Sequence, residues 1–367
     1  MYRAEICSAA VLLALAAELQ ATAEQSAFSS PHWLGPLFEH LAPQVSAEPF
    51  GVVIRREPEG TLAGVLPLAL TRERGLRTVR FADFGVTDYA APIVGPAFPA
   101  DAASSAAFRD AALRALSNYD LVRFERVLPS IAEYANPLAA HTAAGRSRMS
   151  AHRIAIPGTV REHVSALGRK VRKEVDRCQR NIADAGALTL NRAQTAEAAA
   201  RSLAWLEAQQ AERWEGTQGR YRLDQPAYGR FYRAVLERGV EAGFADVFTL
   251  LSGEVPVGAV FGVHGANSFT VLRIASDDAT WGRFSPGRIT LIAVMEHLVA
   301  SGVRTFDLGI GDYEFKRRLG AEPHPLTELT APLSWSGIPV VAGLRTKAFL
   351  RRQPALKGLA DRIRRRA

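Results

Sequence analysis

Hydrophobic and polar positions along the chain follow two spacings, one typical of helices and one typical of strands. Between Ile6 and Leu19, apolar residues recur on one helical face. Glu18 interrupts this run, which favours a packed first helix over the alternative, a secretion signal. Apolar runs at Phe50–Arg55 and Leu62–Leu70 flank a turn-rich segment and predict an antiparallel hairpin. The first half continues with predicted strands at 76–84, 91–95 and 121–126 and a helix at 102–116.

The second half predicts a mixed sheet covered by helices. Helices are expected at 160–185, 195–214, 226–242 and 289–300, and strands at 151–156, 245–251, 255–262, 268–276, 305–310 and 326–333. The helix at 289–300 connects two of these strands, and such a crossover places the strands in parallel. The predicted fold class is therefore α/β, with an α+β mixed sheet.

The length of 367 residues exceeds the size at which one core usually suffices, so two domains are expected. The small and polar segment 139–150 is a suitable boundary. We predict one domain at residues 1–148, a second at 149–335 and a basic tail at 336–367. Both halves place helices and hairpins before a helix and a strand, which is consistent with a degenerate duplication.

The net charge of +8 has a local origin. Residues 343–367 hold nine basic side chains against Asp361 alone, so the rest of the chain is near neutral. This distribution argues only weakly for a nucleic-acid enzyme. A peripheral contact with an anionic membrane and a disordered, solubilising tail are both open for this segment.

No window approaches the roughly eighteen unbroken apolar residues that would span a bilayer, so a soluble protein is expected. Cys7 and Cys178 lie far apart, without a CxxC motif or a Cys/His cluster. We therefore expect neither a disulfide framework nor a metal site, and a cytoplasmic location.

Two segments of the second half suggest chemistry. In Ser285-Pro-Gly-Arg288, Gly287 allows a close backbone approach, Arg288 adds positive charge, and the helix that starts at Ile289 offers N–H groups to a pyrophosphate. The alternative is a plain strand-to-helix turn. The second segment, 305–320, runs from a predicted buried strand into a polar turn. Together they predict an anion-binding cleft beside polar groups, as in an acyl-transfer enzyme.

The residues from 167 to 333 resemble the CelD/BcsL type of acetyltransferase-like domain, a divergent branch of the GNAT superfamily related to FemAB-type peptidyl and aminoacyl transferases. The resemblance is carried by Arg169-Lys-Val-Arg-Lys173, the segment around Trp214, residues 246–262, Ser285-Pro-Gly287 and Phe306-Asp-Leu-Gly-Ile-Gly-Asp-Tyr-Glu-Phe-Lys316. In the first half it is carried by Ser30-Pro-His-Trp-Leu34, Gly64-Val-Leu-Pro-Leu68 and Thr87-Asp-Tyr89.

The resemblance implies tandem GNAT-like domains, of which the second is catalytic. It implies transfer of an acyl group from acetyl-CoA or another acyl-CoA to an amine or hydroxyl, on a small molecule or a saccharide precursor in exopolysaccharide or envelope assembly. The chain lacks the Gln/Arg-x-x-Gly-x-Gly/Ala signature of standard GNAT enzymes, so the identity of the acyl donor is open.

The candidate catalytic residues lie on and just after the strand 305–310. Asp312 is the first candidate for the base, and Asp307 is the second because a strand position can leave it buried and structural. Tyr313 is a candidate proton donor to a leaving thiolate, with packing as the alternative. Lys316 corresponds to the lysine of the family pattern Gly-Asp-x-x-Tyr-Lys, whose tyrosine is Phe315 here.

Donor and acceptor contacts follow from the same resemblance. The strand 268–276 would splay from its neighbour, so that the backbone of Ile274, Ala275 and Ser276 holds a pantetheine arm. The pyrophosphate would be held by Ser285, Gly287, Arg288 and Ile289. Candidate acceptor contacts are Trp214, Arg169 and Arg172, although the two arginines also fit an ordinary solvated helix face.

Two other functions are open. The first is FemAB-type transfer from aminoacyl-tRNA, in which the basic helix would contact the tRNA; nucleic acid is otherwise not expected as a partner. The second is a catalytically silent scaffold that binds acyl-CoA or a glycan.

Overall fold

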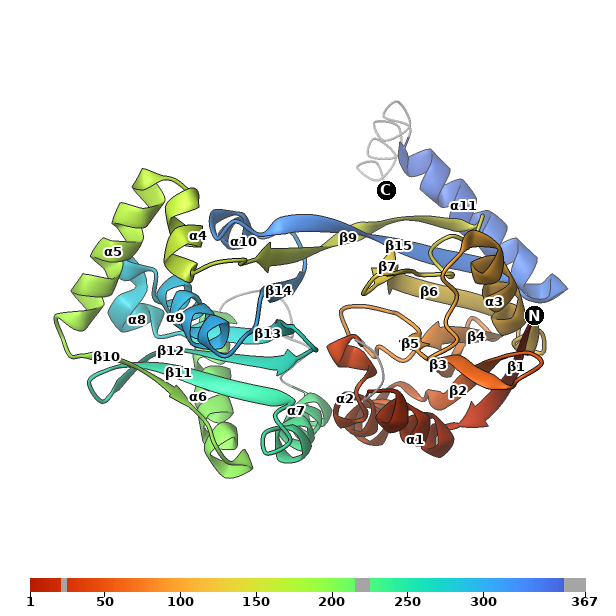
Figure 1. The fold of residues 1–367 in the computed structure, drawn as a ribbon, viewed down its shortest axis with the longest axis horizontal. Coiled ribbons are helices and arrows are strands. Elements are labelled where there is room, and N and C mark those ends of the chain that lie inside the picture. Colours follow the sequence, from red (N-terminus) through yellow and green to blue (C-terminus); the bar gives the residue numbers. More distant parts are fainter. Residues whose placement is uncertain (21–24, 215–224, 353–367) are drawn as a thin grey trace, which may run out of the picture.

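The computed structural model describes residues 1–20, 25–214 and 225–352 and has a mixed α/β fold, as the sequence predicts (Figure 1). The elements of the first half are β1 (Tyr2–Ser8), α1 (Ala9–Gln20), α2 (Pro31–Pro36), β2 (Glu48–Arg56), β3 (Thr61–Glu73), β4 (Leu76–Phe81), β5 (Ile93–Val94), α3 (Ala102–Ala115), β6 (Leu121–Val127) and the small pair β7 (Ser130–Ile131) and β8 (Tyr134–Ala135).

The second half contains more helices. Its elements are β9 (Ala144–Ala155), α4 (Val160–Ala166), α5 (Arg169–Ala183), β10 (Leu188–Arg192), α6 (Ala196–Trp214), α7 (Pro226–Gly239), β11 (Ala245–Ser252), β12 (Val255–His264), β13 (Ser268–Ser276), α8 (Asp278–Trp281), α9 (Pro286–Ala300), β14 (Thr305–Ile310), α10 (Glu314–Arg318), β15 (Glu322–Pro332) and α11 (Ile338–Arg352).

One large sheet joins the two halves, in the strand order β1-β2-β3-β4-β6-β15-β9-β14-β13-β12-β11-β10, with β5 paired to β3. β9 pairs with β14 of the second half, where Ile154 faces Phe306, whereas β15 pairs with β6 of the first half, where Leu329 faces Phe124. These two strands also pair with each other and cross the molecule between the halves (Figure 1). The predicted boundary at 148/149 lies inside β9, so the halves are joined by shared strands.

Helices cover both faces of the second-half sheet. Phe248 and Phe306 face the core formed with α4, α5 and α9. On the other face, α6 and α7 join the core of the first half, and Phe231 of α7 meets the buried ring of Trp33 at 4.9 Å. Burial of these aromatic rings stabilises the contact between the halves.

The structure corrects two predicted elements and adds one. The segment from Ile6 is a strand before it is a helix, because Ile6 pairs with Val52 and α1 begins only at Ala9. The long helix expected at 160–185 is broken at Gly168, whose φ of 107° cannot continue a helix. The short strand β10 was not predicted. By contrast, β13 and β14 have the predicted bounds and are parallel.

Within the described residues, no helix has the length and apolar character needed to cross a bilayer. Residues 353–367 of the basic tail lie outside the described residues.

Candidate functional site

β13 and β14 are paired over three residues only and then separate. The parallel pairing runs from Ser268 opposite Thr305 to Thr270 opposite Asp307. At this point β13 carries a bulge against β12, because the register shifts between Phe261 and Gly262. A bulge bends a strand and increases its twist. The splay expected for this strand from the sequence is therefore present.

A cavity of about 270 Å³ lies in the opening between the two strands. Apolar side chains of β13, β14 and α9 form part of its wall. The polar groups that line it come from three elements and two loops: Asp88, Gln210, Arg273, Tyr313 and Lys316. A largely apolar cavity with a few convergent polar groups is typical of a ligand site.

Lys316 is the buried cation of this cavity. Its side chain is 3% exposed, and Nζ donates to the backbone oxygens of Gly309 at 3.1 Å and Ile310 at 2.7 Å. Burial lowers the pKa of Lys316 to about 8, against the opposing effect of Asp88 and Asp307. Lys316, which was expected at the site from the sequence, thus lines the cavity, and its pKa is lowered toward neutral pH.

Asp88 reaches this cavity from the first half. It lies on the loop after β4, and its Oδ2 accepts the N–H of Ile310 at 3.3 Å. Burial raises the pKa of Asp88 to about 6. A Cβ on Gly309 would lie 2.5 Å from this oxygen, so glycine is required there. No role was predicted for Asp88, although its segment Thr87-Asp-Tyr89 carried part of the resemblance.

Asp307 is buried and structural, as its position on a strand suggested, and it is hydrogen-bonded to three segments of the chain. Its carboxylate accepts the Tyr89 hydroxyl at 2.5 Å, the Gly309 N–H at 2.8 Å and Arg153 Nε at 2.8 Å. Burial and the charge of Asp307 raise the pKa of Tyr89, which therefore stays a hydrogen-bond donor at neutral pH. This network holds the loop with Asp88 against β14.

Asp312 and Tyr313 differ in position. Asp312 has a side chain that is 63% exposed, pairs with Arg317 at 2.6 Å and is not among the residues that line the cavity. The nearest ring nitrogen of buried His152 lies 3.6 Å from it. Tyr313 lines the cavity, and its ring centre lies 5.3 Å from Lys316 Nζ.

The expected donor segments lie side by side. A Cβ placed on Gly287 would be 3.4 Å from Ser276 Oγ and 3.7 Å from the Ile274 side chain. Ile274 lines the cavity, and its carbonyl accepts Gln210 Nε2 at 3.0 Å. Ala275 lies between them on β13. The start of α9 therefore adjoins the strand that leads into the cavity.

The first turn of α9 offers fewer N–H groups than the sequence suggested. Pro286 has none, and the N–H groups of Arg288 and Ile289 both donate to the Ser285 carbonyl, at 3.0 and 3.2 Å. The Arg288 side chain pairs with Glu174 of α5 at 2.8 Å. Two of the four expected donor contacts are thus engaged within the protein.

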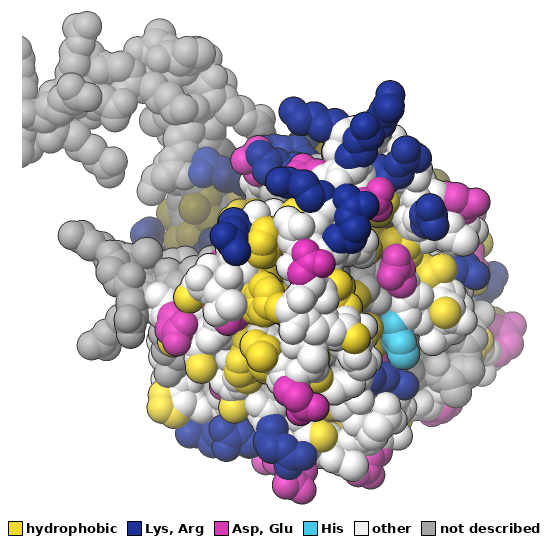
Figure 2. All heavy atoms as spheres, turned by 90° about the vertical axis from the view of Figure 1, so that its left-hand side faces the viewer, with side chains coloured by type: hydrophobic (Ala, Val, Ile, Leu, Met, Phe, Trp, Pro, Cys, Tyr) yellow, Lys and Arg dark blue, Asp and Glu magenta, His cyan; other side chains and the backbone are white. Residues whose placement is uncertain are grey.

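The expected acceptor contacts are at the surface. Arg169 and Arg172 are exposed on α5, and Arg172 borders a groove of about 550 Å³ between α4, α5 and α9 together with Arg161 and Arg180. Figure 2 shows basic side chains gathered over one part of this side of the molecule. Trp214 ends α6, and its side chain lies outside the part that the structure describes.

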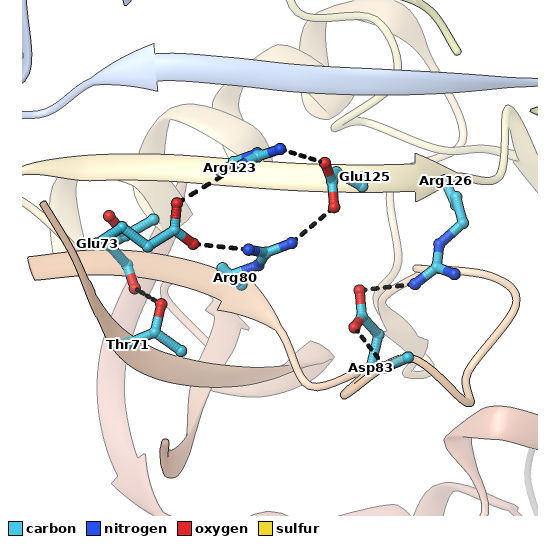
Figure 3. Close-up of polar contacts among 9 residues, drawn as sticks. Thr71, Glu73, Arg80, Asp83, Arg123, Glu125 and Arg126 are labelled. Atoms are coloured by element: carbon cyan, nitrogen blue, oxygen red, sulfur yellow. Dashed lines mark hydrogen bonds and ion pairs between the residues drawn. The ribbon is translucent and has the colours of Figure 1, made fainter. Parts of the chain in front are cut away.

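Two further cavities lie outside this opening. One of about 680 Å³ borders β3, β4 and β6, beside the ion pairs of Figure 3. The other, of about 210 Å³, lies between the halves and includes Tyr89, Arg153 and Asp307. Among the described residues, no group of three or more His, Cys, Asp or Glu side chains could hold a metal ion.

One family model matches the part of the chain that contributes most of the cavity. Residues 169–317 match the model of the acetyltransferase (GNAT) domain. This match runs from α5 to α10 and includes both strands of the opening. No curated protein sequence matches the chain.

Solved structures show a similar fold over most of the chain. FemX has a TM-score of 0.58 at 12% identity, covering 88% of this chain and 95% of FemX. The C-terminal domain (DUF2156) of a candidate lysylphosphatidylglycerol synthetase from Agrobacterium fabrum has a TM-score of 0.55 at 14% identity, covering 94% and 97%. L-PGS from Bacillus licheniformis has a TM-score of 0.52 at 12% identity, covering 93% and 96%. At these identities the likeness shows the fold alone.

Proposed function

We propose that the protein is an acyltransferase that moves an acyl group from an acyl-CoA, such as acetyl-CoA, to an amine or hydroxyl. The observation that carries this proposal is the opening between β13 and β14, where Lys316 and Asp88 line one cavity. The match of residues 169–317 to the GNAT domain supports it.

The two charged groups have complementary roles in this reaction. The acceptor nitrogen or oxygen attacks the thioester carbonyl, and its proton passes to the Asp88 carboxylate, whose pKa of about 6 suits a base at neutral pH. The charge of Lys316 stabilises the oxyanion. The carbon–sulfur bond then breaks, and the Tyr313 hydroxyl supplies the proton that the thiolate takes up. Geometry favours Asp88 over Asp312 as the base, because Asp88 lines the cavity.

The cavity of about 210 Å³ between the halves is our candidate for the acceptor. Its lining includes Ser26, Ser130, Ser268 and Thr270, whose hydroxyls suit a polar acceptor such as a sugar. Asp307 and Tyr89 line this cavity and are hydrogen-bonded to each other. Tyr89 follows Asp88 in the same loop, and Asp307 also accepts the N–H of Gly309 on β14. An acceptor here would approach from the first half, in the cytoplasm, as a saccharide precursor of exopolysaccharide or envelope assembly.

A second candidate is transfer from aminoacyl-tRNA. The exposed basic face of α5 favours it, because a row of cations suits a phosphate backbone (Figure 2). Peripheral membrane contact through the basic tail is compatible with either function.

Ligand-dependent thermal shifts test the proposal. Acetyl-CoA, longer acyl-CoAs, free CoA and total tRNA are each added to the full chain. Stabilisation by an acyl-CoA, with release of free thiol when amine or hydroxyl acceptors are supplied, is expected. Stabilisation by tRNA alone, lost at high salt, would replace the proposal with the second candidate. Binding of CoA without thiol release for any acceptor would indicate a scaffold.

A further inference from the structure

At the first turn of α9, where a donor phosphate is expected from the sequence, Arg288 is paired with a carboxylate of α5. The first turn of α9 adjoins Ile274 and Ser276 of β13, as the contacts of Gly287 show. Leu291, one turn further along α9, lines the cavity itself. Arg288 follows Gly287 directly and is the basic residue of this turn.

Arg288 is held by Glu174 of α5. Its Nη2 donates to Glu174 Oε1 at 2.8 Å, and the Arg288 side chain is only 12% exposed. Among the described residues, Arg288 Nε is buried without a hydrogen-bond partner. The guanidinium group therefore has donor capacity that Glu174 does not satisfy.

Two more arginines act on the same carboxylate. The hydrogen bond from Arg288 lowers the pKa of Glu174, and the charges of Arg288, Arg177 and Arg318 act in the same direction. Glu174 is thus ionised at neutral pH. The other acid in this group is Glu314, which bonds Arg318 at 2.7 Å. Three guanidinium groups from α5, α9 and α10 therefore act on one carboxylate.

This arrangement differs from a helix terminus that binds anions through its amides. Pro286 has no N–H, and the next amides in the turn after Gly287 donate to Ser285. Recognition of an anion here must depend mainly on guanidinium groups, which pair with phosphate as readily as with carboxylate. Glu174 is then a direct competitor for any phosphate.

We infer that Glu174 is a built-in competitor that occupies Arg288 in the free protein and that the diphosphate of the donor displaces it. The identity of that donor as a CoA thioester rests on the proposed function, whereas the competition for phosphate does not. Glu174 would accordingly weaken donor binding, because the phosphates must displace it before they can pair with Arg288.

Calorimetric titration of Glu174→Gln tests the inference with two probes, inorganic pyrophosphate and CoA. Glutamine keeps the size of the side chain and removes its charge, so both probes should bind about tenfold more tightly than to the wild type. Asp184→Asn is the matched control. Asp184 is an exposed acid at the C-terminal end of the same helix, and its replacement changes the net charge equally. The control should change both affinities less than about twofold, since long-range charge effects are screened.

The outcomes separate the inference from the proposed function. Equal effects of the two substitutions, weaker binding by Glu174→Gln, or no pyrophosphate binding by any variant would each overturn the inference. Tighter pyrophosphate binding by Glu174→Gln alone, with no binding of CoA or acyl-CoA, would support the inference and reject a CoA donor. Unchanged thermal unfolding of both variants excludes misfolding as the cause, and Glu174→Ala repeats the test without the amide.

Discussion

The two halves contain the same backbone device, a parallel strand pair that separates, but only the pair of the second half borders the candidate site. In the second half, β13 and β14 part after three residue pairs and leave the cavity with Lys316. In the first half, β4 and β6 part after two, Thr78–Leu121 and Val79–Val122. Ala90 then fills the gap by pairing with Val127 of β6. The opening of the first half is therefore bridged by backbone, and the cavity of about 680 Å³ beside it is bordered by ion pairs.

Charges follow the same division. Beside the first split, Arg80 bonds Glu73 and Glu125 at 2.6 Å each, and Arg123 bonds the same two acids at 3.2 and 2.8 Å (Figure 3). This ring of two cations and two anions neutralises itself. In the second split, burial shifts the pKa values of Lys316 and Asp88 toward neutrality. Perturbed groups in a cleft are typical of function, whereas a closed ring of ion pairs is typical of structure.

One loop links the two splits. The segment that contributes Ala90 to the first split also carries Asp88 and Tyr89 into the second. The loop thus bridges the opening between β4 and β6 in the first half. Its Asp88 also lines the cavity between β13 and β14 in the second half.

The largest effect is expected from removing Lys316, the buried cation of the cavity between β13 and β14. Lys316→Met should lower turnover by about 1,000-fold, because the oxyanion loses its charged partner. Steady-state kinetics with the acyl donor measures the loss, and thermal unfolding shows whether the side chain is also structural. Turnover within about threefold of the wild type would show that the cavity between β13 and β14 takes no part in the reaction.

The choice of base is the next test. Asp88→Asn should lower turnover by about 100-fold, because general-base catalysis contributes roughly that factor. Asp312→Asn makes the same chemical change outside the cavity, and its loss should be much smaller. Measuring both variants with one donor decides the assignment, since the larger loss identifies the base. A larger loss from Asp312→Asn would restore the assignment made from the sequence motif.

The dependence of the rate on pH should show the ionisation of both Asp88 and Lys316. Asp88 must be ionised to accept a proton, so the rate should rise as pH increases through about 6. Lys316 must be protonated to carry charge, so the rate should fall as pH increases through about 8. Each limb should approach tenfold per pH unit far from its midpoint. The acidic limb should disappear from the residual activity of Asp88→Asn, and its persistence there would assign it to another group.

The smallest effect on catalysis is expected from a change beside β4 and β6, the separating strand pair of the first half. Arg80→Met leaves Glu73 and Glu125 each with one cation, Arg123, and should lower the free energy of unfolding by about 2 kcal/mol. Donor affinity and turnover should stay within about twofold of the wild type. Chemical denaturation measures the first quantity and kinetics the second. A large loss of turnover without destabilisation would mean that the first half takes part in the reaction.

Much of the local structure was accessible from the sequence, because apolar periodicity and turn residues act over short distances. The strand pair β13 and β14, the helix between them and the position of Lys316 all follow from one stretch of chain. The strand β1 was missed because a short apolar segment fits either element, and its pairing with β2 decided between them.

The sequence by itself determined the mixed α/β class, the parallel crossover in the second half and the candidate status of Lys316. Tertiary structure alone decided which carboxylate reaches the cavity, because Asp88 and Ile310 are separated by more than two hundred residues and meet only through the shared sheet. It also decided that Arg288 faces Glu174 and that β9 and β15 pair across the halves. Such contacts depend on how distant segments pack, and no local pattern of residues encodes them.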